Sequence, residues 1–236
     1  MIGQRILSVD DLQVYYGDSH ILHGITLSVG EQERVCVLGR NGVGKTTLLR
    51  GLMGLTPPRE GTVIFAQEDI TSLNLWEIAR RGISYVPQGR RVFPRLSVEE
   101  NLQLGSTASN GVMHNLDRVF YLFPVLKDRR RQQGGTLSGG EQQMLAIARG
   151  LIAGPRLMLL DEPSEGLQPS LLQDLTEALE GITDELGISV LLVEQNLDLA
   201  FSVAQRGYVM EKGQMVAEGA VDVLCDDTVV CEYLTL

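Results

Sequence analysis

The stretch that decides the fold is Gly39-Arg40-Asn41-Gly42-Val43-Gly44-Lys45-Thr46-Thr47. The segment 34–38, apolar from Val35 onward and typical of a buried strand, precedes it, and the residues 48–53 that follow have the pattern of a helix. Glycine residues in this spacing, followed by Lys and Thr, place backbone N–H groups around phosphates at a helix N-terminus. The stretch therefore predicts a site for ATP or GTP within an α/β domain.

Two side chains of this stretch have expected roles. Lys45 is placed to reach the β- and γ-phosphates, and the hydroxyl of Thr46 is placed to bind Mg²⁺. The alternative is a glycine-rich turn with an incidental lysine. The strand and the helix on either side of the stretch argue against that alternative.

A second candidate segment is the apolar run 157–160, which ends in Asp161 and Glu162. We expect a buried strand whose last residues project two carboxylates toward the phosphates. Asp161 suits the Mg²⁺ shell, usually through water, and Glu162 is placed to orient or deprotonate the attacking water. An acidic pair at a strand end is common and by itself is weak evidence for a site. Its spacing from the phosphate loop and from the segment 137–140 supports the functional interpretation.

Between these segments lies Leu137-Ser138-Gly139-Gly140-Glu141-Gln142. Together with the phosphate loop and the acidic strand, it resembles the signature of the ABC-transporter ATPases, and the resemblance covers nearly the whole chain. It implies that Tyr16 stacks on the adenine of ATP. It also implies that Gln88 contacts both Mg²⁺ and the attacking water, beside Thr46 and Asp161.

The signature itself predicts a partner. Ser138, Gly139 and Gly140, with Glu141, open a helix and offer N–H groups, a hydroxyl and a positive dipole end. The chain's own ATP is already bound by its phosphate loop. In the resembling family this second anion site closes on the ATP of another ATPase subunit, so a dimer is expected. The alternative is an ordinary helix capped by Ser138.

Two residues depart from the family pattern. Gln195 stands where a His contacts the γ-phosphate, and Gln168 stands where the loop after the acidic pair carries an Asp. Gln195 can donate a hydrogen bond to a phosphate oxygen but cannot carry a charge. We place it with Glu162 among the catalytic residues, against the alternative of an ordinary surface glutamine. Whether the chain's own ATP site is fully active stays open.

Segments 89–102, 134–145 and 192–196 narrow the resemblance to LivF-type subunits of branched-chain amino acid importers. This implies a LivG-type ATPase partner, two membrane permease subunits, a periplasmic binding protein and a position on the cytoplasmic face of the inner membrane. Segments 165–170 and 19–22 also resemble the urea-importer ATPase UrtE. The solute, and the choice between homodimer and heterodimer, therefore remain open.

The pattern along the chain predicts a single ABC ATP-binding domain over 1–236. Alternating segments at 7–9, 12–16 and 21–29 indicate an N-terminal antiparallel β subdomain. Strands at 62–65, 83–87, 157–161 and 189–193, with a helix near 170–186, indicate an α/β P-loop NTPase core at about 1–93 and 151–236. A helical insertion occupies about 94–150, with a capped start at 97–100.

Composition agrees with a globular protein. Hydrophobic residues make up 44% and charged residues 21%, and the net charge of −10 disfavours nucleic-acid binding. No apolar run approaches the ~18–20 residues needed to span a bilayer, and no signal peptide is evident. The cysteines, Cys36, Cys225 and Cys231, form no C-x-x-C pair and suit a reducing compartment.

The expected function is that of an ATP-hydrolysing motor subunit of a bacterial importer. A non-transport ABC ATPase usually carries two cassettes or a long coiled-coil insertion, and a small-molecule kinase would not need the signature at 137–141. We further expect a groove for a cytoplasmic helix of the permease around Arg90, Arg91, Phe93 and 121–123. The alternative is that these aromatic residues fill the helical core.

Overall fold

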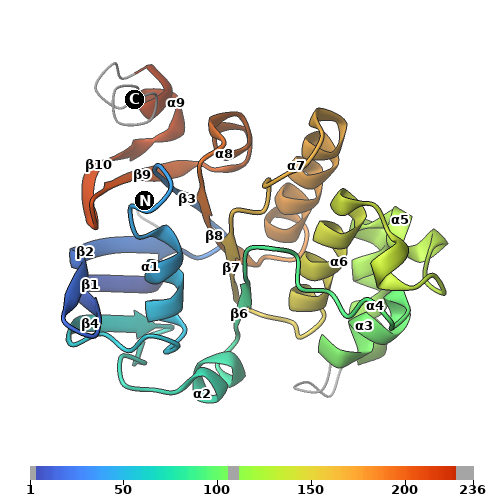
Figure 1. Cartoon of the computed structure of the whole chain (residues 1–236), viewed down its shortest axis with the longest axis horizontal. Helices are drawn as coiled ribbons and strands as arrows, with labels where there is room; N and C mark the ends of the chain where they lie inside the picture. Colours follow the sequence, from blue (N-terminus) through green and yellow to red (C-terminus); the bar gives the residue numbers. More distant parts are fainter. Residues whose placement is uncertain (1–3, 106–111, 227–236) are drawn as a thin grey trace.

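The computed structural model describes residues 4–105 and 112–226, which form two sheets and a separate group of helices (Figure 1). The first sheet has four strands in the order β2-β1-β4-β5, and the second has six in the order β10-β9-β3-β8-β7-β6. The strand orders show that the chain returns repeatedly to the second sheet. Residues far apart in the sequence therefore meet along its edge.

The first sheet is antiparallel and is built from β1 (Arg5–Tyr16), β2 (Ser19–Gly30), β4 (Glu60–Phe65) and the short β5 (Glu68–Asp69). Its alternating pattern buries one face, as expected for a sheet that packs on a core from one side. The two segments expected at 7–9 and 12–16 are one strand. At Asp11 the backbone takes φ +47°, and the pairing with β2 shifts there.

The second sheet holds the parallel strands β3 (Arg34–Leu38), β6 (Ile83–Val86), β7 (Leu157–Asp161), β8 (Ser189–Glu194) and β9 (Arg206–Glu211). The antiparallel strand β10 (Gln214–Ala220) pairs with β9. Strands β3, β7 and β8 are buried along their whole length, which explains their continuous apolar sequence. Strand β6 ends one residue earlier than expected, before Pro87, which lacks a backbone N–H.

Five helices accompany the sheets: α1 (Lys45–Leu52), α2 (Leu75–Arg80), α7 (Pro169–Asp184), α8 (Leu197–Val203) and α9 (Val221–Asp226). A further group lies together on one side of the molecule (Figure 1): α3 (Val98–Gly105), α4 (Val112–Leu122), α5 (Pro124–Asp128), a 3₁₀ turn (Gly134–Thr136) and α6 (Gly139–Leu151). Among the described residues, no helix is both long and apolar enough to cross a bilayer.

The expected fold class is confirmed: a parallel α/β core carries an antiparallel sheet and a helical group. The capped start of the helical group is present, since Ser97 Oγ accepts from the Glu100 N–H at 3.2 Å and the Glu100 carboxylate accepts from the Ser97 N–H at 2.7 Å. No sequence prediction covers α2 or the β9–β10 hairpin. The sequence does contain a signal for each of them. Asn74 is a helix-capping residue at the start of α2, and Lys212-Gly213 forms the turn between β9 and β10.

Candidate active site

The candidate site residues gather where parallel strands end. The register pairs Leu38 of β3 with Glu194 of β8, and Asp161 of β7 with Val193. The N–H of Gly39 donates to the Glu194 carbonyl oxygen at 3.3 Å, which places the start of the phosphate loop beside the end of β8. Ligand sites of open α/β sheets form at this edge, beyond the carboxyl ends of the strands.

The phosphate loop ends at Gly44, which precedes the first turn of α1. Gly44 has φ +116°, and a Cβ atom there would lie 2.8 Å from Leu22 Cδ2, so only glycine fits. No side chain caps α1, whereas capping boxes close the N-termini of α2 and α6. The first N–H groups of α1 are thus left to an anion, which fits a triphosphate.

Lys45 lies across the loop with its side chain 3% exposed. Its ammonium donates to the carbonyl oxygens of Gly39 at 2.7 Å and Arg40 at 3.0 Å. It also forms an ion pair with Glu162, with 3.0 Å between Nζ and Oε1. The buried cation is therefore fixed at the centre of the loop, where a phosphate group would need it.

Asp161 connects two elements through its two carboxylate oxygens. The Thr46 hydroxyl donates to Oδ1 at 3.0 Å, and the Tyr85 hydroxyl donates to Oδ2 at 2.9 Å. Burial raises the pKa of Asp161, while these hydrogen bonds act in the opposite direction. Carboxylate and hydroxyl oxygens are ligands that Mg²⁺ prefers, so the residues present fit this ion.

Tyr85 is a site residue that the sequence analysis does not assign. Burial raises its pKa, and the neighbouring Asp161 carboxylate raises it further, so its hydroxyl remains a donor at neutral pH. A signal was available: a tyrosine within an apolar strand needs a hydrogen-bond partner for its hydroxyl. Which partner it finds depends on the pairing of β6 with β7.

Glu162 follows Asp161 and has a left-handed backbone with φ +46°, which is uncommon for a residue with a side chain. Its Oε2 atom accepts a hydrogen bond from Gln88 Nε2 at 3.1 Å, while Oε1 faces Lys45. The structure thus brings Lys45, Gln88 and Glu162 together, although these residues come from three separate segments.

Two of the expected site residues, Tyr16 and Gln195, lie at the edge of the candidate site. Tyr16 ends β1 and is 43% exposed, with the guanidinium carbon of Arg50 of α1 6.0 Å from its ring centre. Gln195 follows β8 directly and is exposed beside the start of the phosphate loop, and its side chain forms no hydrogen bond with the described residues. Its backbone N–H donates to Glu194 Oε2 at 2.9 Å.

Glu194 itself is a buried carboxylate that ties two loops together. It accepts hydrogen bonds from the backbone N–H groups of Ser164 at 2.9 Å, Gln195 at 2.9 Å and Asn196 at 3.0 Å. Burial raises its pKa, and these bonds partly offset the increase. The segment after Glu162 is therefore bound to the segment that holds Gln195.

The signature residues lie at the N-terminus of α6, in the helical group. Ser138 Oγ accepts from the Glu141 N–H at 3.3 Å, and the Glu141 carboxylate accepts from the Ser138 N–H at 2.7 Å and pairs with Arg129 at 2.8 Å. The Arg90 guanidinium covers Gly139, where a Cβ atom would lie only 2.6 Å from it. Within the described segments, no hydrogen bond or ion pair links Ser138–Glu141 to the phosphate loop.

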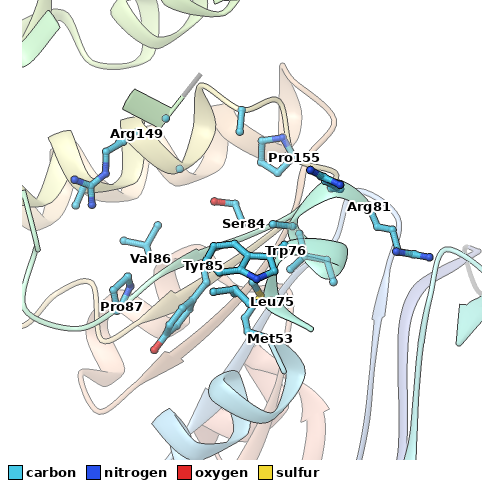
Figure 2. A pocket seen from close by; sticks show the side chains of 18 of the residues that line it. Met53, Leu75, Trp76, Arg81, Ser84, Tyr85, Val86, Pro87, Arg149 and Pro155 are labelled. Carbon is cyan, nitrogen blue, oxygen red and sulfur yellow. The ribbon is translucent and has the colours of Figure 1, made fainter. Parts of the chain in front are cut away.

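A groove of about 1240 Å³ opens between β6 and α2 on one side and α6 on the other (Figure 2). It contains the exposed ring of Trp76 and the ring of Phe93. Among the described residues, six arginines and no carboxylates line it: Arg50, Arg80, Arg81, Arg91, Arg149 and Arg156. Arg149 packs on Phe93 and donates to the Arg91 carbonyl oxygen at 2.8 Å. Its other terminal nitrogen is buried and has no hydrogen-bond partner among the described residues.

Only some of the residues expected to form a groove for a permease helix line this groove. Arg91 and Phe93 line it, but Arg90 and the residues 121–123 do not. The expectation for Phe123 is wrong, because its side chain is 1% exposed and packs in the core shared by the helical group. Pro124 begins α5 directly after it, and the turn between α4 and α5 directs Phe123 inward.

The fold and this site together define a P-loop ATPase. The sequence profile described as "ABC transporter" matches residues 22–165, more than half of the chain. The chain therefore belongs to the ABC transporter ATPase family, as the sequence analysis expects.

Several curated proteins are similar over almost their whole length. The chain is 45% identical over 89% of its length to the "High-affinity branched-chain amino acid transport ATP-binding protein BraG" of Pseudomonas aeruginosa, of which it covers 91%. It is 33% identical to the probable LivF protein of Archaeoglobus fulgidus, covering 91% of this chain and 92% of that one. It is also 33% identical to the lipopolysaccharide export protein LptB of Escherichia coli, covering 97% and 96%.

Among solved structures, a nucleotide-free ATP-binding cassette from an ABC transporter superposes with a TM-score of 0.88. It covers 98% of both chains at 26% identity. This similarity confirms the cassette fold.

Proposed function

We propose that this chain is the ATP-hydrolysing subunit of an importer for branched-chain or other hydrophobic amino acids. The observation that supports this most directly is the 45% identity to BraG across 89% of the chain. LptB has a lower identity of 33% although it aligns over more of the chain. A urea importer remains the alternative, on the sequence resemblance described above.

In the proposed reaction, Lys45 binds the β- and γ-phosphates, and the N–H groups at the start of α1 bind the remaining phosphate oxygens. Thr46, Gln88 and Asp161 would hold Mg²⁺, which neutralises phosphate charge. Glu162, already hydrogen-bonded to Gln88, takes the proton of the attacking water at its carboxylate.

Two further residues would contact the adenine and the γ-phosphate. Tyr16, partly exposed at the end of β1, stacks on the adenine ring. Gln195 donates a hydrogen bond to the γ-phosphate from the end of β8. The loop residues 39–47 enclose the triphosphate.

A second ATPase subunit, of the LivG type, would complete the assembly. The residues Ser138, Gly139, Gly140 and Glu141 form a helix N-terminus that makes no hydrogen bond or ion pair with the chain's own phosphate loop within the described residues. This separation supports their role as the anion site for the ATP bound to the partner. Two ATP molecules would then lie between the two subunits.

The groove described above is the proposed docking site for a cytoplasmic helix of the membrane permease. Arg81 and Arg156 already pair with Glu68 and Glu31. The other four arginines of the groove form no ion pair with the described residues, and in a chain of net charge −10 they favour an occupant with carboxylates. Trp76 and Phe93 favour an apolar face on the same segment. The expected occupant is an acidic, amphipathic helix, which would hold this chain at the cytoplasmic face of the inner membrane.

The experiment uses the complex purified from native membranes through a tag on this chain. Reconstituted in liposomes with its binding protein and ATP, the complex should accumulate labelled leucine but not labelled urea. The same complex carrying Lys45→Ala should accumulate neither. Uptake of urea alone would replace this proposal with the urea importer, and purification without any membrane subunit would contradict a transport role.

A further inference from the structure

Tyr85 belongs to two sites at once. Its ring lies within the groove, on the wall opposite Arg149 of α6 (Figure 2). Its hydroxyl leaves the groove and donates to Asp161 Oδ2 at 2.9 Å, in the phosphate site. Among the described residues that line the groove, Tyr85 alone donates a side-chain hydrogen bond to Asp161 or Glu162.

The contact fixes one side of the Asp161 carboxylate. The other oxygen, Oδ1, accepts from Thr46 at 3.0 Å and points toward the phosphate loop. A carboxylate held at Oδ2 by a neutral donor keeps Oδ1 directed toward the proposed metal site. Without the Tyr85 hydroxyl, the carboxylate could rotate about its last bond, and its geometry toward a metal ion would be less defined.

The groove side of Tyr85 is equally well defined. Strand β6, which carries Tyr85, contacts α2 and α6, the elements that form the two walls. The ring packs against the core cluster beneath the antiparallel sheet, and Arg50 and Arg91 lie near the hydroxyl. A helix seated in the groove would therefore press on the same side chain that orients Asp161.

We propose that Tyr85 is a positioning residue that holds Asp161 in its metal-binding orientation and links that orientation to the groove. The groove part of this proposal rests on the docking role proposed above. The metal part does not, because it concerns the isolated chain. Tyr85 acts through Asp161 and touches neither nucleotide nor water in the reaction.

The test compares wild type with Tyr85→Phe, which keeps the ring and removes the hydroxyl. Tyr121→Phe is the matched control, since Tyr121 is exposed on α4 and lies outside the groove. Affinity for a fluorescent ATP analogue is measured with Mg²⁺ and with EDTA. Tyr85→Phe should weaken binding roughly tenfold in Mg²⁺, the loss expected for one hydrogen bond to a charged group, and leave binding in EDTA unchanged.

Hydrolysis gives a second readout. Tyr85→Phe should raise the Mg²⁺ concentration for half-maximal turnover, and saturating Mg²⁺ should restore most of the maximal rate. Equal Mg²⁺ dependence in wild type and Tyr85→Phe would overturn the positioning role. A failure of solute uptake would leave these measurements standing, because they require no permease.

The link to the groove is tested with Trp76, the single tryptophan of the chain, which lines the groove. Because coupling between two sites is reciprocal, Mg²⁺ added to the ATP-bound chain should shift the Trp76 emission. The shift should persist in Tyr121→Phe and disappear in Tyr85→Phe. Its absence from wild type, or its persistence in Tyr85→Phe, would overturn the link.

Discussion

The ammonium of Lys45 forms an ion pair with the carboxylate of Glu162, with 3.0 Å between Nζ and Oε1. The two groups assigned to different tasks, phosphate binding and proton transfer, thus lie in direct contact. A γ-phosphate bound by Lys45 would be next to the proposed base without any rearrangement of the strands. The pair also neutralises two charges that would otherwise be buried alone.

Lys45→Ala should abolish tight ATP binding and reduce turnover by roughly 10²-fold or more, because it removes the charge directed at the phosphates. The measurement is ATP hydrolysis by the assembled complex together with nucleotide affinity. Lys212→Ala, at an exposed lysine outside the site, is the control. Turnover within a few-fold of wild type would refute the role assigned to Lys45.

Glu162→Gln should retain ATP binding and slow hydrolysis by roughly 10²-fold, because the amide keeps the shape of the side chain but loses the basic oxygen. The ATP-bound dimer should persist longer on size-exclusion chromatography. Glu177→Gln, on the exposed face of α7, is the control.

In a heterodimer the other cassette could conceal this effect, so its own site is disabled in both samples. Unchanged hydrolysis, with no gain in dimer lifetime, would mean that Glu162 is not the general base.

A cysteine at Arg91 should form a disulfide with a cysteine in the cytoplasmic helix of the permease, because Arg91 lines the groove. A cysteine at Tyr121, exposed but outside the groove, should not. Crosslinking is followed by non-reducing electrophoresis of the assembled transporter without ATP. The background carries Cys225→Ser and Cys231→Ser and retains buried Cys36. A product at Tyr121 and none at Arg91 would place docking elsewhere.

Cys36 provides a pH-dependent prediction. Burial raises the pKa of its thiol from an ordinary value of 9.0 to about 12. Between these values the unfolded chain releases the proton and the folded chain keeps it, so stability falls as pH rises. At one pH unit above the ordinary value, the loss should be about 1.4 kcal/mol.

The measurement is urea unfolding at pH 8 and pH 10, with Cys36→Ala as the comparison. The fall in stability between the two pH values should be smaller in Cys36→Ala. An equal fall in both proteins would show that the thiol is not responsible.

Much of this structure can be predicted from local sequence. The glycine spacing around Lys45 predicts the uncapped start of α1, and the apolar run before Asp161 predicts a buried strand, because both depend on neighbouring residues only. The roles of the predicted site residues stay predictions. The apolar run before Asp161 predicts two carboxylates directed toward the phosphates, and the family resemblance adds Gln88 beside them. The structure places Lys45, Gln88 and Glu162 in contact.

The remaining features depend on contacts between distant segments. Whether Phe123 faces solvent or core is decided by the packing of the helical group, and an aromatic residue suits either place. The bond from Tyr85 to Asp161 requires β6 and β7 to pair in one register. The groove requires α2 and α6 to flank β6, and no local pattern specifies that arrangement.

The buried carboxylate of Glu194 has a consequence for communication within the cassette. Because it accepts from Ser164 and also from Gln195 and Asn196, neither loop can be displaced without leaving a buried charge short of donors. The loop after the acidic pair and the loop that carries Gln195 must therefore shift in concert. A change felt by one loop reaches the other through a single side chain, and the site responds as one unit.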